Sequence, residues 1–283
     1  MNSKIHHKKN LLARSSIAYH FSKLNKDPHP TKLKNMLTIL QIPVLNDNYI
    51  YLLHDPVSGE TAAVDPAVAQ PVLDILDQKG WPLTYILNTH HHGDHVGGNL
   101  ELKQKTGCTI IAPLSDRHRI PGMDRGVVDG DAITLGKHSA KVISAPGHTS
   151  GHVVYHFAED NTLFCGDTLF VMGCGRLFEG TAEQMWHSLQ KLKALPAATK
   201  IYCAHEYTQT NGRFALTVEP ENRDLQQRMD VINELRANHQ PTVPSVPQSR
   251  ALIASIRKTN ELRPRKDQPA RRVSPSGDVD LCW

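Results

Sequence analysis

The sequence lacks any run of 18 or more consecutive apolar residues, so it offers no segment long enough to cross a membrane as a helix. It also lacks a Cys-x-x-Cys pair, and its five cysteines, at positions 108, 165, 174, 203 and 282, are odd in number and scattered. A reduced compartment therefore fits the chain better than a disulfide framework. With 283 residues the chain can bury a full core, as one large domain or as one domain with a smaller companion.

Acidic residues are almost absent from the first 35 residues, which carry eight lysines and arginines against one acid, Asp27, and hence a net charge of +7. The rest of the chain has 24 basic and 27 acidic residues, a net charge of −3. The formal charge of +4 therefore belongs to the leader, and it gives no support to a nucleic-acid-binding body.

Apolar patterning predicts an α+β protein with strands first and helices last. Short apolar runs predict strands at Ile39–Val44, Tyr49–His54, Thr61–Val64, Thr84–Asn88, Thr109–Ala112, Ala132–Leu135, Lys141–Ser144, Val153–Phe157, Thr162–Cys165 and Lys200–Cys203. Helical spacing and cap signals predict helices at Ala69–Lys79, Asn99–Gln104, Thr181–Ala194, Asn211–Val218, Asn222–Asn238 and Arg250–Leu262.

Histidine is abundant and concentrated in one stretch, Thr89-His90-His91-His92-Gly93-Asp94-His95. The run follows an apolar segment, 83–87, and precedes Gly97-Gly98, so it lies on a strand-to-helix loop, where ligands are commonly displayed. A purification tag would lie at a terminus and contain histidine alone, and a solvated metal-scavenging tract would not follow a buried strand. The spacing therefore predicts a metal site and is compatible with two. Imidazole and carboxylate together suit Zn²⁺, Fe, Mn and Co.

Three further motifs each place a histidine or aspartate in a turn after an apolar run: Pro146-Gly147-His148-Thr149, Cys165-Gly166-Asp167-Thr168 and Cys203-Ala204-His205-Glu206-Tyr207. Four places in the chain thus supply nitrogen and oxygen ligands. The candidate ligands are His90, His92, Asp94, His95, His148, Asp167 and His205.

The order HxHxDH, PGHT, GDT and AHEYT resembles the metallo-β-lactamase superfamily, which includes lactamases, lactonases, nucleases and dioxygenases. Two more stretches, GCGRLFEGT at 173–181 and PVLNDNY at 43–49, make the chain most similar to the glyoxalase II (hydroxyacylglutathione hydrolase) family. The resemblance runs from about Met36 to about Thr217 and recurs near residues 263–267. It implies a four-layer αββα sandwich, with the metal site at one edge between the sheets, and a C-terminal helical domain.

The resemblance also implies two divalent ions, zinc in the first place and iron or manganese as alternatives. It assigns His90, His92 and His148 to one ion, Asp94, His95 and His205 to the other, and Asp167 as the bridge between them. His91 is not a ligand in this pattern and should point away. A metal-bridged hydroxide would attack a thioester carbonyl, with the two aspartates, Asp94 and Asp167, serving catalysis as ligands.

Substrate contacts must come from outside the metal cluster. Glutathione carries two carboxylates, and Arg176 is one candidate partner. Arg263 and Lys266 resemble the family's clamp for the glycine carboxylate, with a solvated basic tail as an equal alternative. Tyr207 offers a hydroxyl and a flat face, and Phe178 stands where some family members have a glutathione-binding tyrosine. The stretch between Tyr207 and Arg263 is shorter than usual, which leaves open a truncated or altered helical domain.

The function implied is hydrolysis of S-(2-hydroxyacyl)glutathione thioesters, such as S-lactoylglutathione, in methylglyoxal detoxification. Four alternatives stay open: a one-iron glutathione-persulfide dioxygenase of the same fold, another hydrolase of the superfamily, a nucleic-acid-processing metallohydrolase, and a non-catalytic metal-binding protein. The complete second ligand set argues against the dioxygenase. The net charge of −3 outside the leader argues against nucleic acid as a partner.

We expect four parts: a basic leader (1–35), a catalytic domain (36–205), a helical substrate-binding domain (206–268) and a tail (269–283). The leader is interpreted as a disordered tail, a transit peptide or the product of an upstream start codon, since Met36 begins the family-like sequence. The expected protein is a cytoplasmic monomer without membrane or nucleic-acid partners, with organelle targeting by the leader as the alternative.

Overall fold

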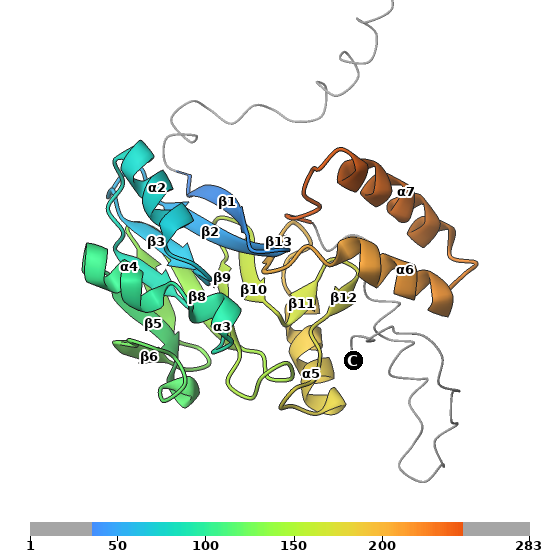
Figure 1. The fold of residues 1–283 in the computed structure, drawn as a ribbon. Helices are drawn as coiled ribbons and strands as arrows, with labels where there is room; N and C mark the ends of the chain where they lie inside the picture. The colour runs from blue at the N-terminus through green and yellow to red at the C-terminus, as the bar shows by residue number, and fades with distance from the viewer. Residues whose placement is uncertain (1–35, 246–283) are drawn as a thin grey trace, which may run out of the picture. The chain divides into compact units, whose positions relative to one another are not determined.

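The computed structural model describes residues 36–245, in which two β-sheets lie face to face with helices on their outer sides (Figure 1). The first sheet has six strands in chain order: β1 (Thr38–Val44), β2 (Asn48–His54), β3 (Thr61–Val64), β4 (Tyr85–Leu87), β5 (Thr109–Pro113) and β6 (Arg125–Val127). The second has five, in the order β13 (Lys200–Cys203), β10 (Thr162–Gly166), β9 (Val153–Phe157), β8 (His138–Ser144) and β7 (Ala132–Leu135).

Strand direction decides which loops meet. In the first sheet β1, β2 and β3 form antiparallel hairpins, and β3 to β6 run parallel. In the second sheet β7 to β10 are antiparallel, and β10 pairs with β13 in parallel. Because parallel strands end at the same edge, the segments after β3 and β4, and those after β10 and β13, are brought together.

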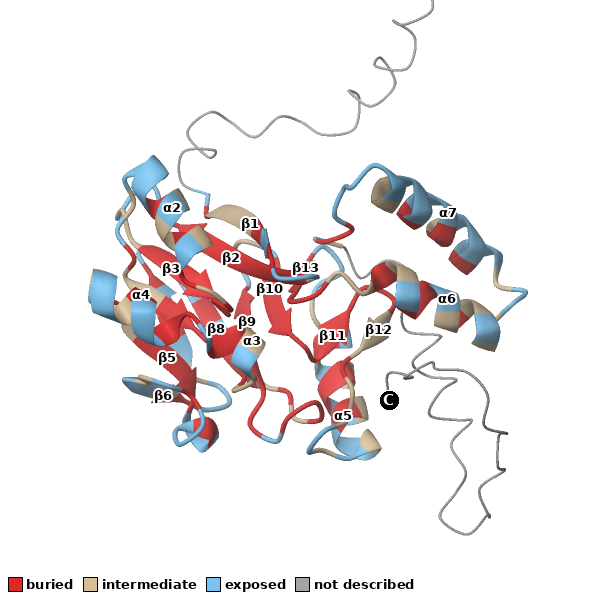
Figure 2. Cartoon of the chain, viewed as in Figure 1, coloured by how far each residue is buried: buried red, intermediate tan, exposed pale blue. Residues whose placement is uncertain are grey.

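The core lies between the two sheets, whose strands are buried along most of their length (Figure 2). Aromatic rings fill its centre: the Tyr51 ring lies 5.4 Å from that of Phe164, and the Phe157 ring lies 6.0 Å from that of Phe164. Alternating and continuous apolar runs in the sequence therefore correspond to strands buried on one face or both.

A second apolar layer separates the first sheet from its outer helices, α2 (Gln70–Lys79) and α4 (Asn99–Thr106). Val72 and Leu102 from these helices pack with Leu52 and Ile86 of the sheet. Helix α2 ends at Gly80 as predicted, because this residue adopts a left-handed conformation, φ 66°, that favours glycine.

Helix α5 (Ala182–Lys193) covers the second sheet and begins at the predicted capping box. The Thr181 side chain accepts from the Gln184 backbone N–H, and the Gln184 side chain accepts from the Thr181 N–H. Its buried residues Met185 and Leu189 join the central core. The expected sandwich of two sheets between helices is confirmed.

After β13 the chain is helical, as predicted, with α6 (Thr208–Val218) and α7 (Arg223–Ala237) packed together. Helix α6 begins three residues earlier than predicted, because its polar first turn carries no apolar periodicity. The buried Glu206 carboxylate ties this part to the sheets, accepting from the Tyr49 hydroxyl at 2.7 Å and from the Thr242 N–H at 2.8 Å. None of the helices described in 36–245 is long and apolar enough to cross a membrane.

Several short elements were not predicted. They are β6, the ribbon of β11 (Leu169–Phe170) and β12 (Gly173–Cys174), the helix α3 (Gly93–Val96) and a 3₁₀ turn at Leu114–Asp116. The strands among them and the 3₁₀ turn have only two or three residues, and the four residues of α3 are too few to show a helical period. The predicted helix Arg250–Leu262 lies outside the described residues.

Candidate metal centre

The seven candidate ligands meet at the edge of the two sheets where several strands end. Strand β4 leads into the histidine run, and α3 presents Asp94 and His95. Asp167 follows β10 and His205 follows β13, so the parallel pairing of these strands places both residues at one edge. His148 comes from the loop between β8 and β9.

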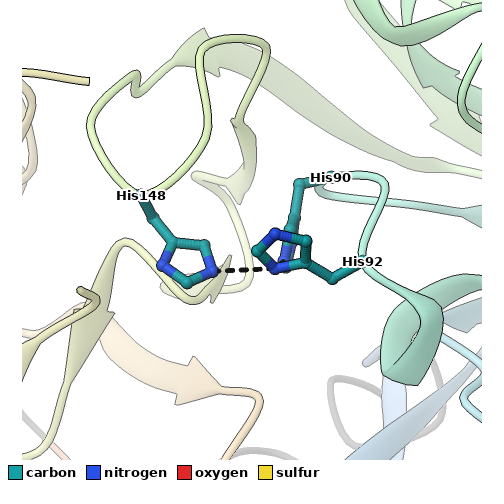
Figure 3. Close-up of side chains that lie close together, drawn as sticks. All are labelled: His90, His92 and His148. Atoms are coloured by element: carbon teal, nitrogen blue, oxygen red, sulfur yellow. Dashed lines mark hydrogen bonds between the residues drawn. The ribbon is translucent and has the colours of Figure 1, made fainter. Parts of the chain in front are cut away.

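Three histidines form the first cluster, with their rings converging from two loops (Figure 3). His92 Nδ1 lies 3.0 Å from His90 Nε2 and 3.1 Å from His148 Nε2. A tetrahedral site with Zn–N bonds of about 2.0–2.1 Å holds its nitrogens about 3.3 Å apart, so this spacing is close to that of a metal-binding triad.

The second cluster consists of Asp94, His95 and His205. Asp94 Oδ2 lies 3.4 Å from His205 Nε2 and 3.8 Å from His95 Nε2. The Asn48 side-chain amide donates to the same carboxylate oxygen at 3.1 Å and fixes its direction. Asp94 is thus turned toward the two rings.

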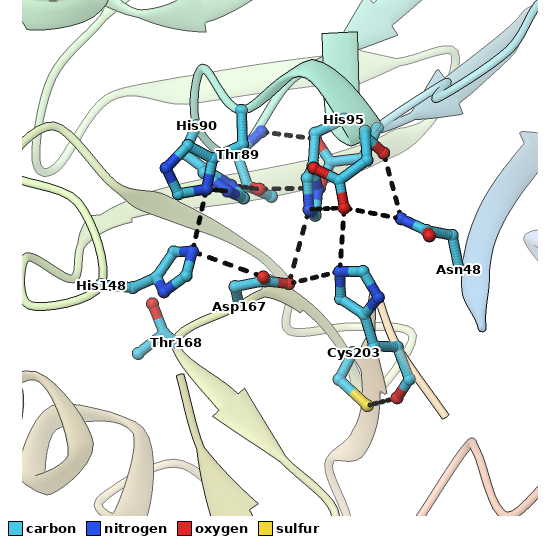
Figure 4. A network of polar contacts seen from close by, with 12 residues as sticks. Asn48, Thr89, His90, His95, His148, Asp167, Thr168 and Cys203 are labelled. Atoms are coloured by element: carbon cyan, nitrogen blue, oxygen red, sulfur yellow. Dashed lines mark hydrogen bonds and ion pairs between the residues drawn. The ribbon is translucent and has the colours of Figure 1, made fainter. Parts of the chain in front are cut away.

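Asp167 stands between the two clusters and faces both (Figure 4). Its Oδ2 lies 3.4 Å from His148 Nε2, whereas its Oδ1 lies 3.4 Å from His205 Nε2 and 3.6 Å from His95 Nε2. Within the described residues, Asp167 Oδ1 and His95 Nε2 are buried atoms without a hydrogen-bond partner. Buried polar atoms are rarely left unpaired, so these two orphans fit a site built for cations.

Residues behind the rings hold them in orientation. His148 Nδ1 donates to the Arg176 carbonyl at 2.8 Å, and His205 Nδ1 donates to Asp47 Oδ1 at 2.8 Å. His95 Nδ1 donates to Asp65 Oδ2 at 3.1 Å. In each case the proton is on Nδ1, which leaves Nε2 free for a metal.

His90 is held in the same way by a relay. The Thr89 hydroxyl donates to Asp65 Oδ2 at 2.7 Å, so its oxygen accepts from His90 Nδ1 at 3.0 Å. Asp65 has a left-handed backbone, φ 47°, which is uncommon outside glycine and marks a constrained position. Asp65 also forms a close group with His90 and His95, from behind the rings.

The fully buried His152 was missing from the predicted site. Its ring stacks on His90 at 4.8 Å, and its Nε2 accepts from the Asp167 backbone N–H at 3.2 Å. His152 therefore supports both the ring of His90 and the backbone of Asp167, which lies between the clusters. Its place four residues after His148 is the signal that could have suggested it.

Burial and neighbouring charge tune the site electrostatically. Burial lowers the pKa of His90 well below its usual value and that of His92 to about 4, so both rings are neutral at neutral pH. Burial opposes the charge on Asp167, but His95 and His205 outweigh it and hold the Asp167 pKa well below its usual range. The same carboxylate, with Asp65, raises the pKa of His95. The neutral His90 and His92 rings and the ionised Asp167 are in the protonation states that metal binding requires, whereas His95 and His205, with raised pKa values, would release a proton when a metal binds.

His91 points away from both clusters, as predicted. Its Nδ1 lies 3.1 Å from Asp116 Oδ2, and its Nε2 lies 3.5 Å from Glu179 Oε1. The residue is therefore part of a polar network beside the site.

The candidate substrate residues that the structure describes lie directly beside the candidate ligands. Phe178 is 61% exposed, and its ring meets those of His92 and His148 edge-on at 5.5 and 5.2 Å. Tyr207 stacks on His205 at 4.7 Å. Arg176 is half-buried and contributes its carbonyl to His148. Two further predicted residues lie outside the described part: Arg263 and Lys266.

Comparison with known proteins agrees with this geometry. A family model of the metallo-beta-lactamase superfamily matches residues 47–205, and one of the hydroxyacylglutathione hydrolase C-terminus matches residues 206–260. A hydroxyacylglutathione hydrolase of Methylococcus capsulatus is 64% identical over 211 residues, covering 75% of this chain and 82% of that protein. One of Maricaulis maris is 54% identical over 238 residues, covering 84% and 90%.

Among solved structures, ETHE1 from Myxococcus xanthus superposes with a TM-score of 0.56 at 25% identity, covering 78% of this chain and 97% of that one. The fold and the clustered histidines and aspartates define a protein of the metallo-β-lactamase superfamily, with side chains suited to binding metal ions. Within that superfamily, the chain belongs to the hydroxyacylglutathione hydrolase family.

Proposed function

We propose that the protein hydrolyses S-(2-hydroxyacyl)glutathione thioesters, such as S-lactoylglutathione, to a 2-hydroxy acid and glutathione, in methylglyoxal detoxification. The observation that carries the proposal is Asp167, which faces a three-histidine cluster with one oxygen and the Asp94, His95 and His205 cluster with the other. The family membership of the chain supplies the substrate class.

Two divalent ions, zinc in the first place, would be held by these clusters. His90, His92 and His148 offer three neutral nitrogens, which suit Zn²⁺. Asp94, His95 and His205 offer two nitrogens and one oxygen, a set that iron and manganese also accept. The Asp167 carboxylate would serve both ions.

When bound, the ions supply Lewis acidity and lower the pKa of a coordinated water to about 7. The chain's own residues then orient the ligands. Asn48 donates to Asp94 Oδ2 and turns this carboxylate toward the second cluster, where it would serve as a ligand rather than as a general base. A thiolate is a weakly basic leaving group, with a pKa of about 8.5 for a free thiol, so the reaction needs no separate general acid.

We assign substrate recognition to residues beside the candidate ligands and in the C-terminal part of the chain. The exposed Phe178 ring and the stacked Tyr207 ring would pack against the thioester and the peptide. Arg176, Arg263 and Lys266 would pair with the two carboxylates of glutathione. The proposed division of labour places catalysis in residues 36–205 and substrate binding in 206–268, in a monomer that works in the cytoplasm.

An activity panel tests the proposal. The metal-loaded protein should release thiol from S-lactoylglutathione, without oxygen uptake on glutathione persulfide and without hydrolysis of a β-lactam. Elemental analysis of the same sample should find two metal ions per chain. Oxygen uptake with persulfide, in a protein that holds one iron and leaves the thioester intact, would replace the proposal by the dioxygenase alternative.

A further inference from the structure

Four side chains that are not candidate ligands form a continuous polar network beside the three-histidine cluster. They are His91, Asp116, Arg119 and Glu179, here called the outer clamp. His91 bridges Asp116 and Glu179 with its two ring nitrogens, at 3.1 and 3.5 Å. Arg119 bridges the same two carboxylates: its Nη2 donates to Asp116 Oδ1 at 2.6 Å, and its Nη1 donates to Glu179 Oε1.

Each end of the outer clamp joins a segment that carries a histidine of the first cluster. His91 lies between His90 and His92 in the chain. Glu179 accepts from the Ser150 N–H and hydroxyl, both at 2.8 Å, and Ser150 lies two residues after His148. The Glu179 segment also supplies the Arg176 carbonyl that receives the His148 Nδ1 proton. The clamp therefore connects the three segments on which the geometry of this cluster depends.

Asp116 is the buried anchor of the clamp, with 1% of its surface exposed. It packs so closely against the loop after His148 that a Cβ on Gly151 would overlap Asp116 Oδ1. At the outer end, the Arg119 hydrogen bond lowers the Glu179 pKa to about 2, so Glu179 stays ionised at any ordinary pH. The ion pair of Arg119 with Glu179 therefore stays charged.

The second cluster depends on different residues. Asn48 holds Asp94, Asp65 holds His95 and Asp47 holds His205. Among residues 36–245, the hydrogen bonds and ion pairs of the outer clamp include none to that cluster. The outer clamp therefore contacts only the segments of the first cluster, whereas Asp65 supports a histidine of each cluster, His90 through Thr89 and His95 directly.

We propose that Glu179 is a positioning residue which, through the outer clamp, sets the affinity of the His90, His92 and His148 site for its ion and leaves the other site unchanged. The inference rests on the proposed function, since it presumes that both clusters bind metal. Losing an outer partner of a metal ligand typically weakens binding by about 10- to 100-fold, and here the loss should be confined to one of two sites.

Two single-site backgrounds make the selectivity measurable. The substitution His205→Ala leaves the three-histidine site as the intact one, and His148→Ala leaves the Asp94 and His95 side. In the first background, Glu179→Gln should weaken zinc binding about 10- to 100-fold in competition with a chelator. In the second background it should leave the zinc affinity unchanged. Equal weakening in both backgrounds, or none in the first, would overturn the proposal.

Three further variants separate positioning from general loss of structure. Gly151→Ala keeps Glu179 but displaces Asp116, so it should give the same selective weakening. Glu183→Gln makes the same chemical change on the exposed first turn of α5 and should alter neither site. Asp47→Asn should show the reverse selectivity, because Asp47 supports His205. Wild-type protein that binds no zinc would defeat the proposed function itself, whereas zinc binding without selectivity would defeat only this inference.

Discussion

At the scale of single residues, the site depends on one carboxylate that faces two sets of rings. The two oxygens of Asp167 are not equivalent: one faces His148, and the other faces His95 and His205. The side chain is buried, and its backbone is held by His152, so it has little freedom to serve one cluster alone. Its removal should therefore affect both.

We expect Asp167→Asn to remove nearly all thioesterase turnover and to lower zinc affinity at both sites, because an amide supplies one neutral oxygen where the carboxylate supplies two charged ones. Zinc content after dialysis and kcat for S-lactoylglutathione are the measurements. Asp160→Asn is the matched control, since Asp160 pairs with His138 at the far end of β10. An Asp167→Asn protein that retains two ions and full turnover would contradict the assignment of Asp167 as the bridge.

The histidine cluster also predicts how the metal-free protein responds to acid. Burial lowers the pKa of His90, His92 and His152, so these rings take up protons near pH 6.5 when unfolded but not when folded. Their contribution to stability is lost as pH falls below that value. His95 and His205 have raised pKa values and act in the opposite direction, since the stability they add is present below pH 6.5 and lost at higher pH.

The histidines with lowered pKa values outnumber those with raised values. The Tm of chelator-treated protein should therefore fall as the pH is lowered from about 7.5 to about 5. Thermal unfolding followed by circular dichroism at several pH values measures this. Added zinc should flatten the curve near pH 7, where metal and protons compete for the same nitrogens. A metal-free Tm that rises on acidification would show that His95 and His205 dominate.

Sequence reasoning identified the residues that meet at the site but missed those that orient them. His90, His148 and His205 stand in motifs with recognisable spacing. Asp65 reaches His95 because β3 and β4 pair side by side, and Asp47 reaches His205 because an isolated bridge joins Asn48 to His205 between the two sheets. Such contacts depend on sheet order, which no local pattern encodes.

At the scale of elements, the parallel pairing of β10 with β13 and helix α5 position the site. Helix α5 supports the loop that carries His148: Ser188 Oγ donates to the Pro146 carbonyl at 2.7 Å, and Met185 packs against Gly147 so closely that any side chain there would clash. Gly147 also has φ 150°, a conformation that side chains rarely adopt. A change at the start of α5 should therefore lower the stability of the fold more than it affects the reaction.

Removing the cap of α5 by Thr181→Ala should lower the free energy of unfolding by about 1 kcal/mol, because the Gln184 N–H loses its acceptor, the Thr181 hydroxyl. Urea denaturation measures the change, and Thr181→Ser, which keeps the hydroxyl, should restore most of it. The KM for the thioester should not move, since Thr181 contacts neither cluster. A loss of activity at full stability would assign Thr181 a role in the site that the cap does not explain.

The predictability of elements followed their length. Strands of four residues or more, such as Val153–Phe157, were recognised from their apolar runs, and α5 from its capping box. The sequence predicts a loop at the short helix α3, although this helix presents Asp94 and His95. Four residues give no helical period, so local spacing does not indicate this helix.

At the scale of the whole molecule, the catalytic sheets and the C-terminal helices meet beside a candidate metal ligand. Glu206 directly follows His205 and accepts from Tyr49 of β2 and from Thr242 after α7, while the Arg236 guanidinium of α7 lies 3.7 Å away. One buried carboxylate thus connects the first sheet, helix α7 and the segment after it at a position next to His205. The predicted contacts with the glutathione carboxylates would not touch the reacting carbonyl. Their loss should therefore weaken substrate binding more than it slows the chemical step.

Arg263→Ala tests this separation. Losing a partly exposed ion pair to a glutathione carboxylate should cost about 1–3 kcal/mol. If the pair is equally strong in the ground and transition states, KM for S-lactoylglutathione should rise about 5- to 150-fold while kcat stays nearly constant. A small thioester without the tripeptide should be hydrolysed as by the wild type. Equal losses on both thioesters would mean that Arg263 supports the fold, and no change on either would leave recognition of glutathione to Arg176 and Tyr207.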